Sequence, residues 1–357
     1  LFTEGTRAQD GIKHVHVPID TLKPGTQLPH ISTRHLSPSK AADVADWVAH
    51  MLHIGVLRPA TTRGPAPAPT HVVRTGEKIR VVHDTSAHKK VFAPFRVVAP
   101  TPDEKLTHFA GAKVFAKFDI PGAFYSILLN SDTPADMRQI SIGNNIFDST
   151  RAIMGSPNSS AFLEYVMEQV LGPLLYNPVI PTADDLATPG KGNTLAEAQE
   201  HLVATLEALA ERLLYHNVTL KPSKTDFYTE ELHYCGNIIT KDGYRRDPAS
   251  LDAIKAVQLP TNGAELASLY YGAQWVATHI PNFTPRFAHI LAALNRMYTD
   301  SGSRKSDSVR KYPIAKYGIT HEHCAELRQA LLEAAQLAHR NPDMDLVLMT
   351  DASSDGF

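Results

Sequence analysis

The first clear pattern of apolar and polar positions along the chain is helical and lies between Ser37 and Gly55. Val44, Val48 and Met51 recur at intervals of three and four residues, which places them on one face of a helix. Ser37 is suited to cap this helix, a proline follows in the first turn, and Gly55 is a typical end. The segment therefore predicts an amphipathic helix.

A strand pattern occupies residues 114–120 in the middle of the chain. Its four even-numbered positions are apolar and share one face, whereas Phe115, Lys117 and Asp119 share the other. Asp119 is therefore predicted to point away from the apolar layer, near the end of the strand.

The segments around this strand alternate between strand-like and helical patterns. Turn-forming residues 143–145 separate two strand-like runs and predict a hairpin. Thr194 and Glu197 form a capping box before a helix with a stripe of leucines. The predicted strands are Lys78–His83, Gln139–Ile142, Ile146–Ala152, Val179–Ala187 and His233–Thr240, and the predicted helices are Ser159–Leu171 and Leu195–Tyr215. This order predicts an α+β fold with a split βαβ sheet covered by helices on one face.

Beyond Arg246 the patterns are helical only. The predicted helices are Pro248–Val257, Gly263–His279, Pro285–Tyr298 and His321–Ala338. Between the last two lies the polar stretch Thr299–Lys311, which looks disordered. An apolar run, Leu346–Met349, resembles the first strand of a further domain, and the chain opens on Leu1 without Met. We therefore expect a segment of a longer polyprotein.

The composition of the chain indicates its cellular compartment and limits the kinds of partner it can bind. The chain has 357 residues, of which 43% are hydrophobic, enough for two or three packed units. Lys and Arg number 35 against 37 Asp and Glu, so a nucleic-acid groove would have to be a local concentration of positive charge. There are two cysteines, and no apolar run approaches the roughly 20 residues of a membrane span. These features predict an intracellular protein without a membrane segment.

Three carboxylates are the candidate catalytic groups. Asp184 and Asp185 lie in an otherwise apolar or small-residue stretch, where a buried carboxylate without a partner is costly. If they occupy a tight turn beside the end of the strand that carries Asp119, all three converge on one sheet edge. Such oxygen ligands suit Mg²⁺, and paired metal ions support in-line displacement at phosphorus. For the pair alone, a solvated turn is the more frequent explanation.

Five motifs occur in the order found in gypsy-type LTR retrotransposon reverse transcriptases, and the chain resembles that family. The motifs are Lys117-Phe118-Asp119-Ile120, Met154-Gly155-Ser156-Pro157-Asn158, Thr182-Ala183-Asp184-Asp185-Leu186, Leu220-Lys221-Pro222-Ser223-Lys224 and Tyr234-Cys235-Gly236-Asn237. Each motif is weak alone, but their shared order is a strong signal. The resemblance continues through Ile280-Pro281-Asn282-Phe283 and ends at Thr350-Asp351-Ala352-Ser353, which looks like the opening of a tethered RNase H domain.

The resemblance implies a right-hand polymerase fold with a split βαβ palm, fingers and a helical thumb, followed by the beginning of an RNase H-like domain. The implied regions are an N-terminal arm in residues 1–36, fingers with part of the palm in 37–113, the palm in 114–245, the thumb and a linker in 246–312, and a truncated RNase H-like start in 313–357.

The resemblance also implies roles for single residues. Asp119, Asp184 and Asp185 would be catalytic and would hold Mg²⁺, or Mn²⁺ in its place. Lys224 would protonate the leaving pyrophosphate, although a general phosphate contact is as plausible. The implied nucleotide-binding residues are Arg80, Phe124, Gly155 and Asn158, and the implied primer grip is Tyr234, Cys235 and Gly236. From the sequence alone, Phe124 could equally be an ordinary core residue, and the alternative for Arg80 is a solvated strand residue.

The implied function is RNA- and DNA-templated DNA synthesis by a nucleotidyltransferase. Its partners would be an RNA template, a DNA primer–template and dNTPs, and its location would be cytoplasmic particles or the nucleus. Thr182 and Ala183 replace the bulky residues usual before the two aspartates, and the other departures from the family pattern are Ser86, Ser160 and Asn237. A second hypothesis is therefore a degenerate or domesticated copy that binds nucleic acid without catalysis. The three intact carboxylates favour the first hypothesis and the substitutions favour the second.

Overall fold

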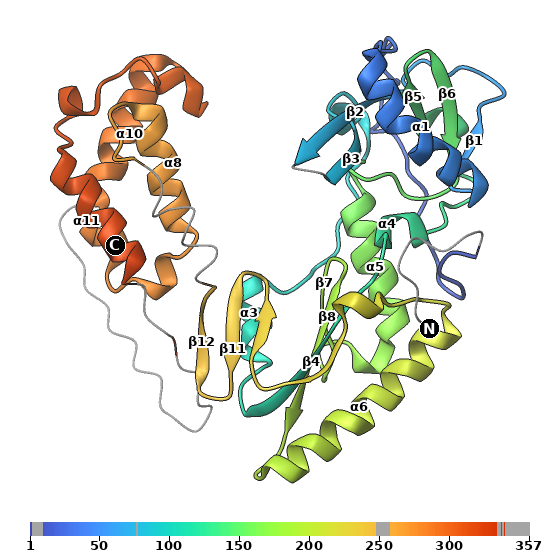
Figure 1. Ribbon diagram of the computed structural model, residues 1–357. Helices are drawn as coiled ribbons and strands as arrows, with labels where there is room; N and C mark the ends of the chain where they lie inside the picture. The colour runs from blue at the N-terminus through green and yellow to red at the C-terminus, as the bar shows by residue number, and fades with distance from the viewer. Residues whose placement is uncertain (2–9, 76–77, 248–257, 334–336, 338, 340–357) are drawn as a thin grey trace. The chain divides into compact units, whose positions relative to one another are not determined.

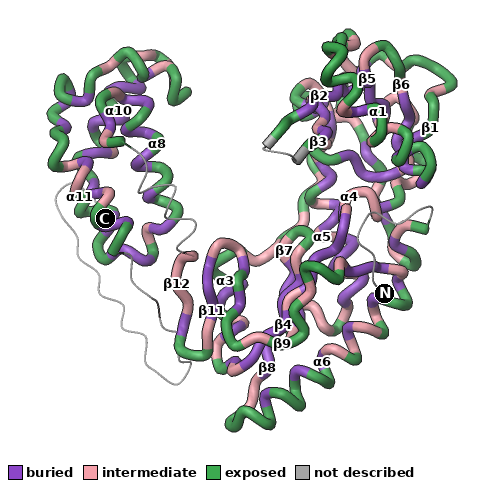
Figure 2. Tube along the Cα trace, in the orientation of Figure 1, coloured by how far each residue is buried: buried purple, intermediate pink, exposed green. Residues whose placement is uncertain are grey.

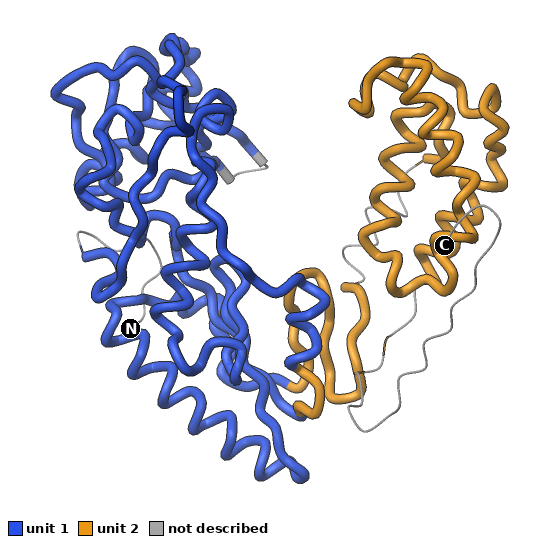
Figure 3. The backbone as a smooth tube through the Cα atoms, turned by 180° about the vertical axis from the view of Figure 1, so that it is seen from behind, with its two compact units in different colours: residues 1–108, 113–229 blue, residues 109–112, 230–357 orange. Residues whose placement is uncertain are grey.

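The computed structural model describes residues 1, 10–75, 78–247, 258–333, 337 and 339. The chain divides into two compact units (Figure 3). Unit 1 comprises residues 1–108 and 113–229, and unit 2 comprises residues 109–112 and 230–357. The predicted helix Pro248–Val257 and the predicted strand at Leu346 lie outside the described residues.

A five-stranded sheet with helix α1 forms one part of unit 1. The strand order is β1-β6-β5-β2-β3. β2 pairs with β5 in parallel, whereas the pairs β1–β6, β5–β6 and β2–β3 are antiparallel. Ser37 caps α1 as predicted, and Val44 and Met51 of α1 are buried against this sheet. The elements are α1 (Pro38–His53), β1 (Leu57–Pro59), β2 (Ala68–Thr75), β3 (Lys78–His83), β5 (Gln139–Ile142) and β6 (Asn145–Ser149).

The predicted hairpin and turn in this sheet are confirmed with one shift. Ile142 pairs with Asn145, so Gly143 and Asn144 alone form the turn and β6 begins at Asn145. Gly143 has a φ of 58°, which a glycine adopts without a Cβ penalty.

A four-stranded sheet forms the rest of the unit 1 framework, in the order β7-β8-β4-β9. Its members are β4 (Ala112–Asp119), β7 (Ile180–Thr182), β8 (Asp185–Lys191) and β9 (Asp226–Thr229). Helices α5 (Ser159–Leu171) and α6 (Leu195–Tyr215) pack on this sheet, and both have the predicted bounds. Figure 1 shows α5 and α6 along the β4–β8 region. The short helices of unit 1 are α2 (His88–Val91), α3 (Pro102–Thr107) and α4 (Ala123–Ser126).

The even-numbered positions of β4 belong to the apolar core, as the alternating pattern predicted. Val114, Ala116 and Phe118 are buried with α5 and α6 side chains in one cluster. The opposite face of β4 is largely buried too, since Phe115 is 0% exposed and Asp119 is 5% exposed, while Lys117 is half-buried. The strand is therefore covered on both faces, and Figure 2 shows its mostly buried path.

Unit 2 contains a three-stranded sheet, β10-β11-β12, and a set of helices with its own core. The elements are β10 (Leu232–Tyr234), β11 (Asn237–Thr240), β12 (Gly243–Arg246), α8 (Gly263–Gln274), α9 (Phe283–Arg286), α10 (Ala288–Ser301) and α11 (His321–Leu332). The predicted helix Gly263–His279 is shorter than expected, because α8 ends at Gln274 and a separate 3₁₀ turn covers Ala277–His279.

The stretch Thr299–Lys311 is ordered, so the prediction of disorder was wrong. Helix α10 continues to Ser301, and a 3₁₀ turn covers Ser306–Val309. Val309 is 0% exposed and belongs to the core of unit 2. Hydrogen bonds among Ser301, Ser303 and Ser308 also hold the segment, and its polar composition did not reveal this order.

Among the described residues, none of the helices is both long enough and apolar enough to span a bilayer.

Candidate active site

Asp119 is the last residue of β4, and its main chain is fixed by a second segment. The backbone N–H of Lys221 donates to the carbonyl of Asp119 at 2.9 Å. Lys221 precedes a 3₁₀ turn, Pro222–Lys224, which brings Lys224 to the same strand end. The first aspartate and the predicted lysine motif are therefore neighbours, although they lie far apart in the sequence.

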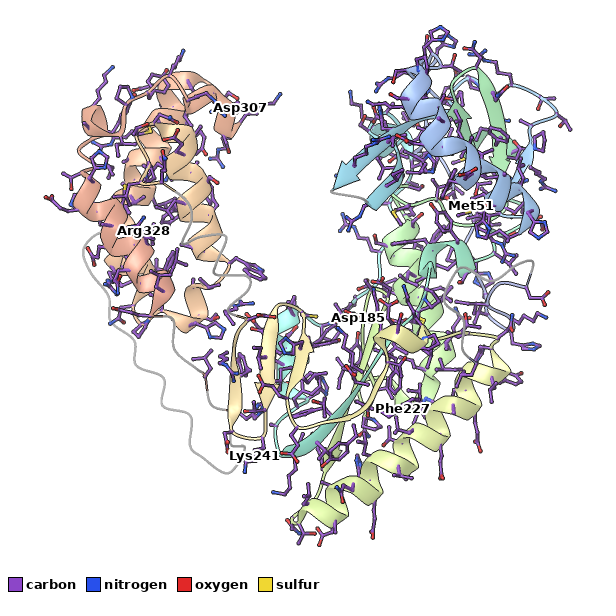
Figure 4. All side chains as sticks on the ribbon, viewed as in Figure 1. Met51, Asp185, Phe227, Lys241, Asp307 and Arg328 are labelled. Carbon is purple, nitrogen blue, oxygen red and sulfur yellow. The ribbon has the colours of Figure 1, made fainter. Side chains whose placement is uncertain are left out.

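Asp184 and Asp185 lie at a two-residue hairpin turn between β7 and β8. Thr182 pairs with Asp185, so Ala183 and Asp184 make the turn. Ala183 has a φ of 52°, in the left-handed region that residues with a Cβ adopt at a cost. A positive φ at the first turn position is the pattern of a type II′ turn, which normally has glycine there. The tight turn expected from the sequence is present, and Figure 4 labels Asp185, the first residue after it.

The turn lies beside the end of β4. The backbone N–H of Ile120 donates to the carbonyl of Asp184 at 2.8 Å, which joins the residue after Asp119 to the turn. β4 and β8 are also neighbours in the sheet. The main chain therefore brings Asp119, Asp184 and Asp185 to one edge of the four-stranded sheet.

Two lysines form ion pairs with these carboxylates. Lys224 Nζ lies 2.7 Å from Asp119 Oδ1, and Lys117 Nζ lies 3.5 Å from Asp185 Oδ2. The side chains of Lys117 and Asp185 are 24% and 31% exposed, so water screens their pair only in part. Asp119 is more deeply buried than Asp185, and the Lys224 ammonium is its charged partner.

The local charges shift two pKa values. Burial raises the pKa of Asp185 above its ordinary value of 3.8, the nearby Asp184 and Asp119 add to this rise, and Lys117 opposes it. The hydrogen bond to Asp119 raises the pKa of Lys224, and Asp184 and Asp185 also favour its charged form. The edge therefore has an excess of negative charge that favours a cation.

The donor set suits a hard divalent cation, because it consists of carboxylate oxygens. Within the described part of the chain, however, no three acidic, His or Cys side chains already surround a single point. Asp119 and Asp185 instead face Lys224 and Lys117. A metal ion would therefore have to replace these ammonium groups as the partner of the carboxylates.

The four residues predicted to bind nucleotide have different surroundings. Arg80 is exposed on β3, and Phe124 is half-buried against the core beside β4. Gly155 has a φ of 92°, and its carbonyl accepts a hydrogen bond from the Thr85 hydroxyl. These placements leave the predicted roles as predictions.

Asn158 is 3% exposed and its amide joins two neighbouring segments. Its Nδ2 donates to Asp20 Oδ1 at 2.7 Å and to the carbonyl of Ala93 at 3.0 Å, while its Oδ1 accepts from Phe95 N at 3.0 Å. Every one of these contacts is internal. They give Asn158 a structural role, and nucleotide binding by this residue stays a prediction.

The predicted primer-grip residues form the β10–β11 turn in unit 2. Tyr234 pairs with Asn237, so Cys235 and Gly236 make the turn, with φ values of 51° and 73°. Tyr234 is 1% exposed, and its ring packs against Phe109 at a centroid distance of 5.5 Å. The ring of this tyrosine is therefore part of the interior, and the primer-grip role stays a prediction.

Residues 70–239 match the sequence model of the family described as reverse transcriptase (RNA-dependent DNA polymerase). This match spans the three aspartates, the lysine motif and the β10–β11 turn. The chain contains a reverse transcriptase domain.

Curated relatives place this reverse transcriptase domain among retrotransposon proteins. The chain is 24% identical to the Retrovirus-related Pol polyprotein from transposon 297 of Drosophila melanogaster over 327 residues, which is 89% of this chain and 29% of that protein. For the Pol polyprotein from transposon gypsy of the same organism, the identity is 24%, covering 88% of this chain and 30% of that protein. The chain thus spans about a third of the length of these relatives, and the resemblance to gypsy-type reverse transcriptases is confirmed.

Solved structures share the fold. A foamy viral protease-reverse transcriptase dRH in complex with ds DNA has a TM-score of 0.75 at 18% identity, covering 94% of this chain and 55% of that chain. A foamy viral protease-reverse transcriptase in complex with RNA/DNA hybrid has a TM-score of 0.73 at 17% identity, covering 94% of this chain and 43% of that chain. The predicted polymerase fold is confirmed by these likenesses.

The reverse transcriptase domain has one buried residue near the aspartate turn that the sequence did not single out. Lys105, in α3, is 6% exposed and donates to the carbonyl of Pro181 at 2.8 Å. In the sequence it follows Asp103 and Glu104, where a lysine is normally solvated. No periodicity could be read from a helix of only six residues, so the sequence held no usable signal for its burial.

Proposed function

We propose that this chain catalyses DNA synthesis on RNA and DNA templates by metal-dependent nucleotidyl transfer. The observation that carries the proposal is the hydrogen bond from Ile120 N to the Asp184 carbonyl at 2.8 Å, because it brings the turn aspartates beside Asp119 within the matched domain. Nucleic-acid partners are supported by the similar foamy viral structures, one in complex with ds DNA and one with an RNA/DNA hybrid.

The reaction forms a bond between the primer 3′-oxygen and the α-phosphorus of a dNTP and breaks the bond to pyrophosphate. Asp119, Asp184 and Asp185 would hold Mg²⁺, or Mn²⁺ in its place, and the bound cation would stabilise the charge on the attacking and leaving oxygens. The protein's own part is to fix these carboxylates at the sheet edge through backbone hydrogen bonds. Fixed groups need little reorganisation during the reaction.

Lys224 is suited to electrostatic stabilisation of the leaving pyrophosphate. Its hydrogen bond to Asp119 raises its pKa, and an ammonium group with a raised pKa gives up its proton less readily. Release of Asp119 to a metal would free the Lys224 charge for a phosphate. If Lys224 donates a proton instead, the rate of extension must depend on the titration of Lys224. The pH dependence of single-turnover extension, measured for the parent and for Lys224→Arg, therefore separates the two roles. A parent profile that falls with the titration of Lys224 and is lost in Lys224→Arg would support proton donation.

Phe124 is proposed to favour deoxynucleotides. Its half-buried ring follows Asp119 by five residues, at the start of the short helix α4. A rigid ring beside the sugar would clash with a 2′-hydroxyl, because packed interiors yield little. Phe124→Val should therefore raise the ratio of ribonucleotide to deoxynucleotide incorporation, and an equal loss for both nucleotides would assign the ring to packing alone.

Primer extension on an RNA template with Mg²⁺ tests the proposed function. The parent should extend the primer, and extension should stop in EDTA. A second candidate function, nucleic-acid binding without catalysis, is favoured by Thr182 and Ala183 at positions that are bulky in the resembling family. Template binding without extension, under conditions where the folded protein binds Mn²⁺, would support that second function. The proposed location, cytoplasmic particles or the nucleus, awaits localisation of the tagged polyprotein in cells.

A further inference from the structure

Lys105 is a buried lysine directly behind the aspartate turn. It belongs to α3, whose start is fixed by a capping box between Thr101 and Glu104. The residue is 6% exposed. Removing an ammonium group from water costs several kcal/mol unless its hydrogen bonds are replaced, so its acceptors hold it in place.

Two hydrogen-bond acceptors of Lys105 are the last two residues of β7. Its Nζ donates to the Pro181 carbonyl at 2.8 Å and lies 3.3 Å from Thr182 Oγ1. The Thr182 hydroxyl in turn donates to the Pro181 carbonyl at 2.9 Å. Lysine, hydroxyl and carbonyl therefore form one small network at the point where the strand enters the turn.

The turn needs such support because its backbone is strained. Ala183 has a φ of 52°, which costs a residue with a Cβ about 1–2 kcal/mol relative to a helical or extended conformation. Strained residues keep their conformation only where the surrounding structure holds them. On one side, Ile120 N holds the carbonyl of Asp184, and on the other side Lys105 holds the strand that leads into Ala183.

A narrow crevice next to the turn is lined by Lys105, Pro181 and Ala183 together with Glu164 and Glu168 of α5. Burial raises the pKa of Glu168, and the nearby Glu164 adds to the rise. Lys105 therefore lies along the same crevice as two carboxylates of α5 and the aspartate turn.

We propose that Lys105 is a positioning residue that, through Thr182 and Pro181, holds the turn in the conformation in which Asp184 and Asp185 bind a divalent cation. This inference deepens the proposed function and rests on it. The residue does not touch the reacting atoms. Thr182 and Ala183 have small side chains that give the turn little packing. The hydrogen-bond network of Lys105 supports the turn in place of that packing.

The test uses Mn²⁺ as the probe, without nucleotide or primer. Binding of Mn²⁺ to the whole chain is measured by electron paramagnetic resonance for Lys105→Met, which keeps the aliphatic stem, and for the pair Thr182→Val and Thr182→Ser. Loss of a group that orients metal ligands typically weakens metal binding about 10- to 100-fold. We expect a loss of this order in Lys105→Met, a smaller loss in Thr182→Val, and parent-like binding in Thr182→Ser, which keeps the hydroxyl.

A matched control is Lys191→Met, which removes an ammonium at the other end of β8. It should leave Mn²⁺ affinity unchanged. The double variant Lys105→Met with Thr182→Val should bind Mn²⁺ no worse than Lys105→Met alone, because both changes remove the same network. Parent-like Mn²⁺ binding in folded Lys105→Met would overturn the proposal. If that variant does not fold, equal binding by Thr182→Val and Thr182→Ser would overturn it.

Failure of the proposed function gives a different result. In that case the parent binds Mn²⁺, and Lys105→Met weakens the binding, but the parent does not extend a primer. Positioning by Lys105 would then stand while polymerase activity would not. If the parent extends, Lys105→Met should need about 10-fold more Mg²⁺ for half-maximal extension, with a smaller change in KM for dNTP.

Discussion

Two hairpin turns in this protein have the same length but are held in different ways. The β7–β8 turn has one residue with a positive φ, Ala183, and the side chain of Lys105 from helix α3 supports it. The β10–β11 turn has two, Cys235 and Gly236, and its second position is a glycine that packs under a ring. The first turn therefore depends on side-chain support for a strained alanine, whereas the second has a glycine at one of its two positions of positive φ.

The ring at the second turn belongs to Trp275. A Cβ added to Gly236 would lie 2.8 Å from Trp275 Cη2, too close for normal contact. Arg246 covers the same ring, with its guanidinium carbon 4.4 Å from the centroid, and donates to the Trp275 carbonyl at 2.7 Å. The second turn is therefore fixed by steric contact and the first by hydrogen bonds and charge.

The largest expected effect comes from the carboxylates of the first turn. Asp184→Asn, or Asp119→Asn, should reduce extension at least about a hundredfold, since metal stabilisation of the transition state contributes several kcal/mol and each 1.4 kcal/mol is about tenfold. Single-turnover extension at saturating Mg²⁺ measures the loss. Asp307→Asn, at an exposed site labelled in Figure 4, is the control and should extend like the parent. Comparable rates for Asp184→Asn and the parent would refute the assignment.

Breaking the second turn should lower stability instead. Gly236→Ala places a Cβ on a residue with a φ of 73° and against the Trp275 ring, so we expect a loss of at least about 1–2 kcal/mol and a midpoint about 2–8 °C lower. Gly302→Ala is the matched control, because Gly302 has a φ of 65° with no atom near the added Cβ. The difference between the two variants in thermal unfolding isolates the contact with Trp275. Equal losses would mean that the ring moves aside freely.

Because the pKa of Asp185 is raised, the stability of the protein with its first turn should depend on pH. Its folded pKa exceeds the ordinary value of 3.8, so the folded protein binds the proton more tightly and stability is lost as pH rises through that window. Asp185→Asn removes this loss. The measurement is the thermal unfolding midpoint in EDTA. The midpoint of Asp185→Asn minus that of the parent should increase as pH rises from below 3.8 toward neutrality. A gap that is constant with pH would mean that burial does not disfavour the Asp185 charge.

The smallest effect is expected at Ala183. Ala183→Gly relieves the left-handed strain of about 1–2 kcal/mol but adds backbone freedom to the unfolded chain, which costs about 0.4–1 kcal/mol. Stability in thermal unfolding should therefore rise by roughly 1 kcal/mol at most, the opposite sign to Gly236→Ala. A clear loss of stability would show that the methyl group of Ala183 contributes packing in its crevice.

Helices and strands with a regular apolar pattern or a clear cap could be predicted from the sequence. Thr194 and Glu197 marked the start of α6, and the alternation of residues 114–120 placed Asp119 opposite the apolar face of β4. Both signals are local, so neighbouring positions suffice to read them. The two aspartates at a tight turn followed from the same kind of reasoning.

Contacts between distant segments could not be predicted. Lys105 meets Pro181 across 76 positions of sequence, and nothing near Lys105 distinguishes it from a solvated lysine. The same limit applies to Asn158, whose motif suggested a nucleotide contact while its amide binds Asp20 and Ala93. Burial of Val309 was missed because its neighbours are polar.

The parallel pairing of β2 with β5 has a consequence for how the protein folds during synthesis. The β5–β6 hairpin lies between β1 and β2 in the five-stranded sheet. β1 and β2 therefore cannot join the same sheet until β5 and β6 have been synthesised. β4, with Asp119, lies between β2 and β5 in the sequence and leaves the ribosome before β5. Long-range pairing of this kind is slow. The five-stranded sheet can therefore be completed once β6 is made, whereas β4 still waits for its own partners, β8 and β9. A nascent chain that stops before Gln139 leaves strand edges open to other chains.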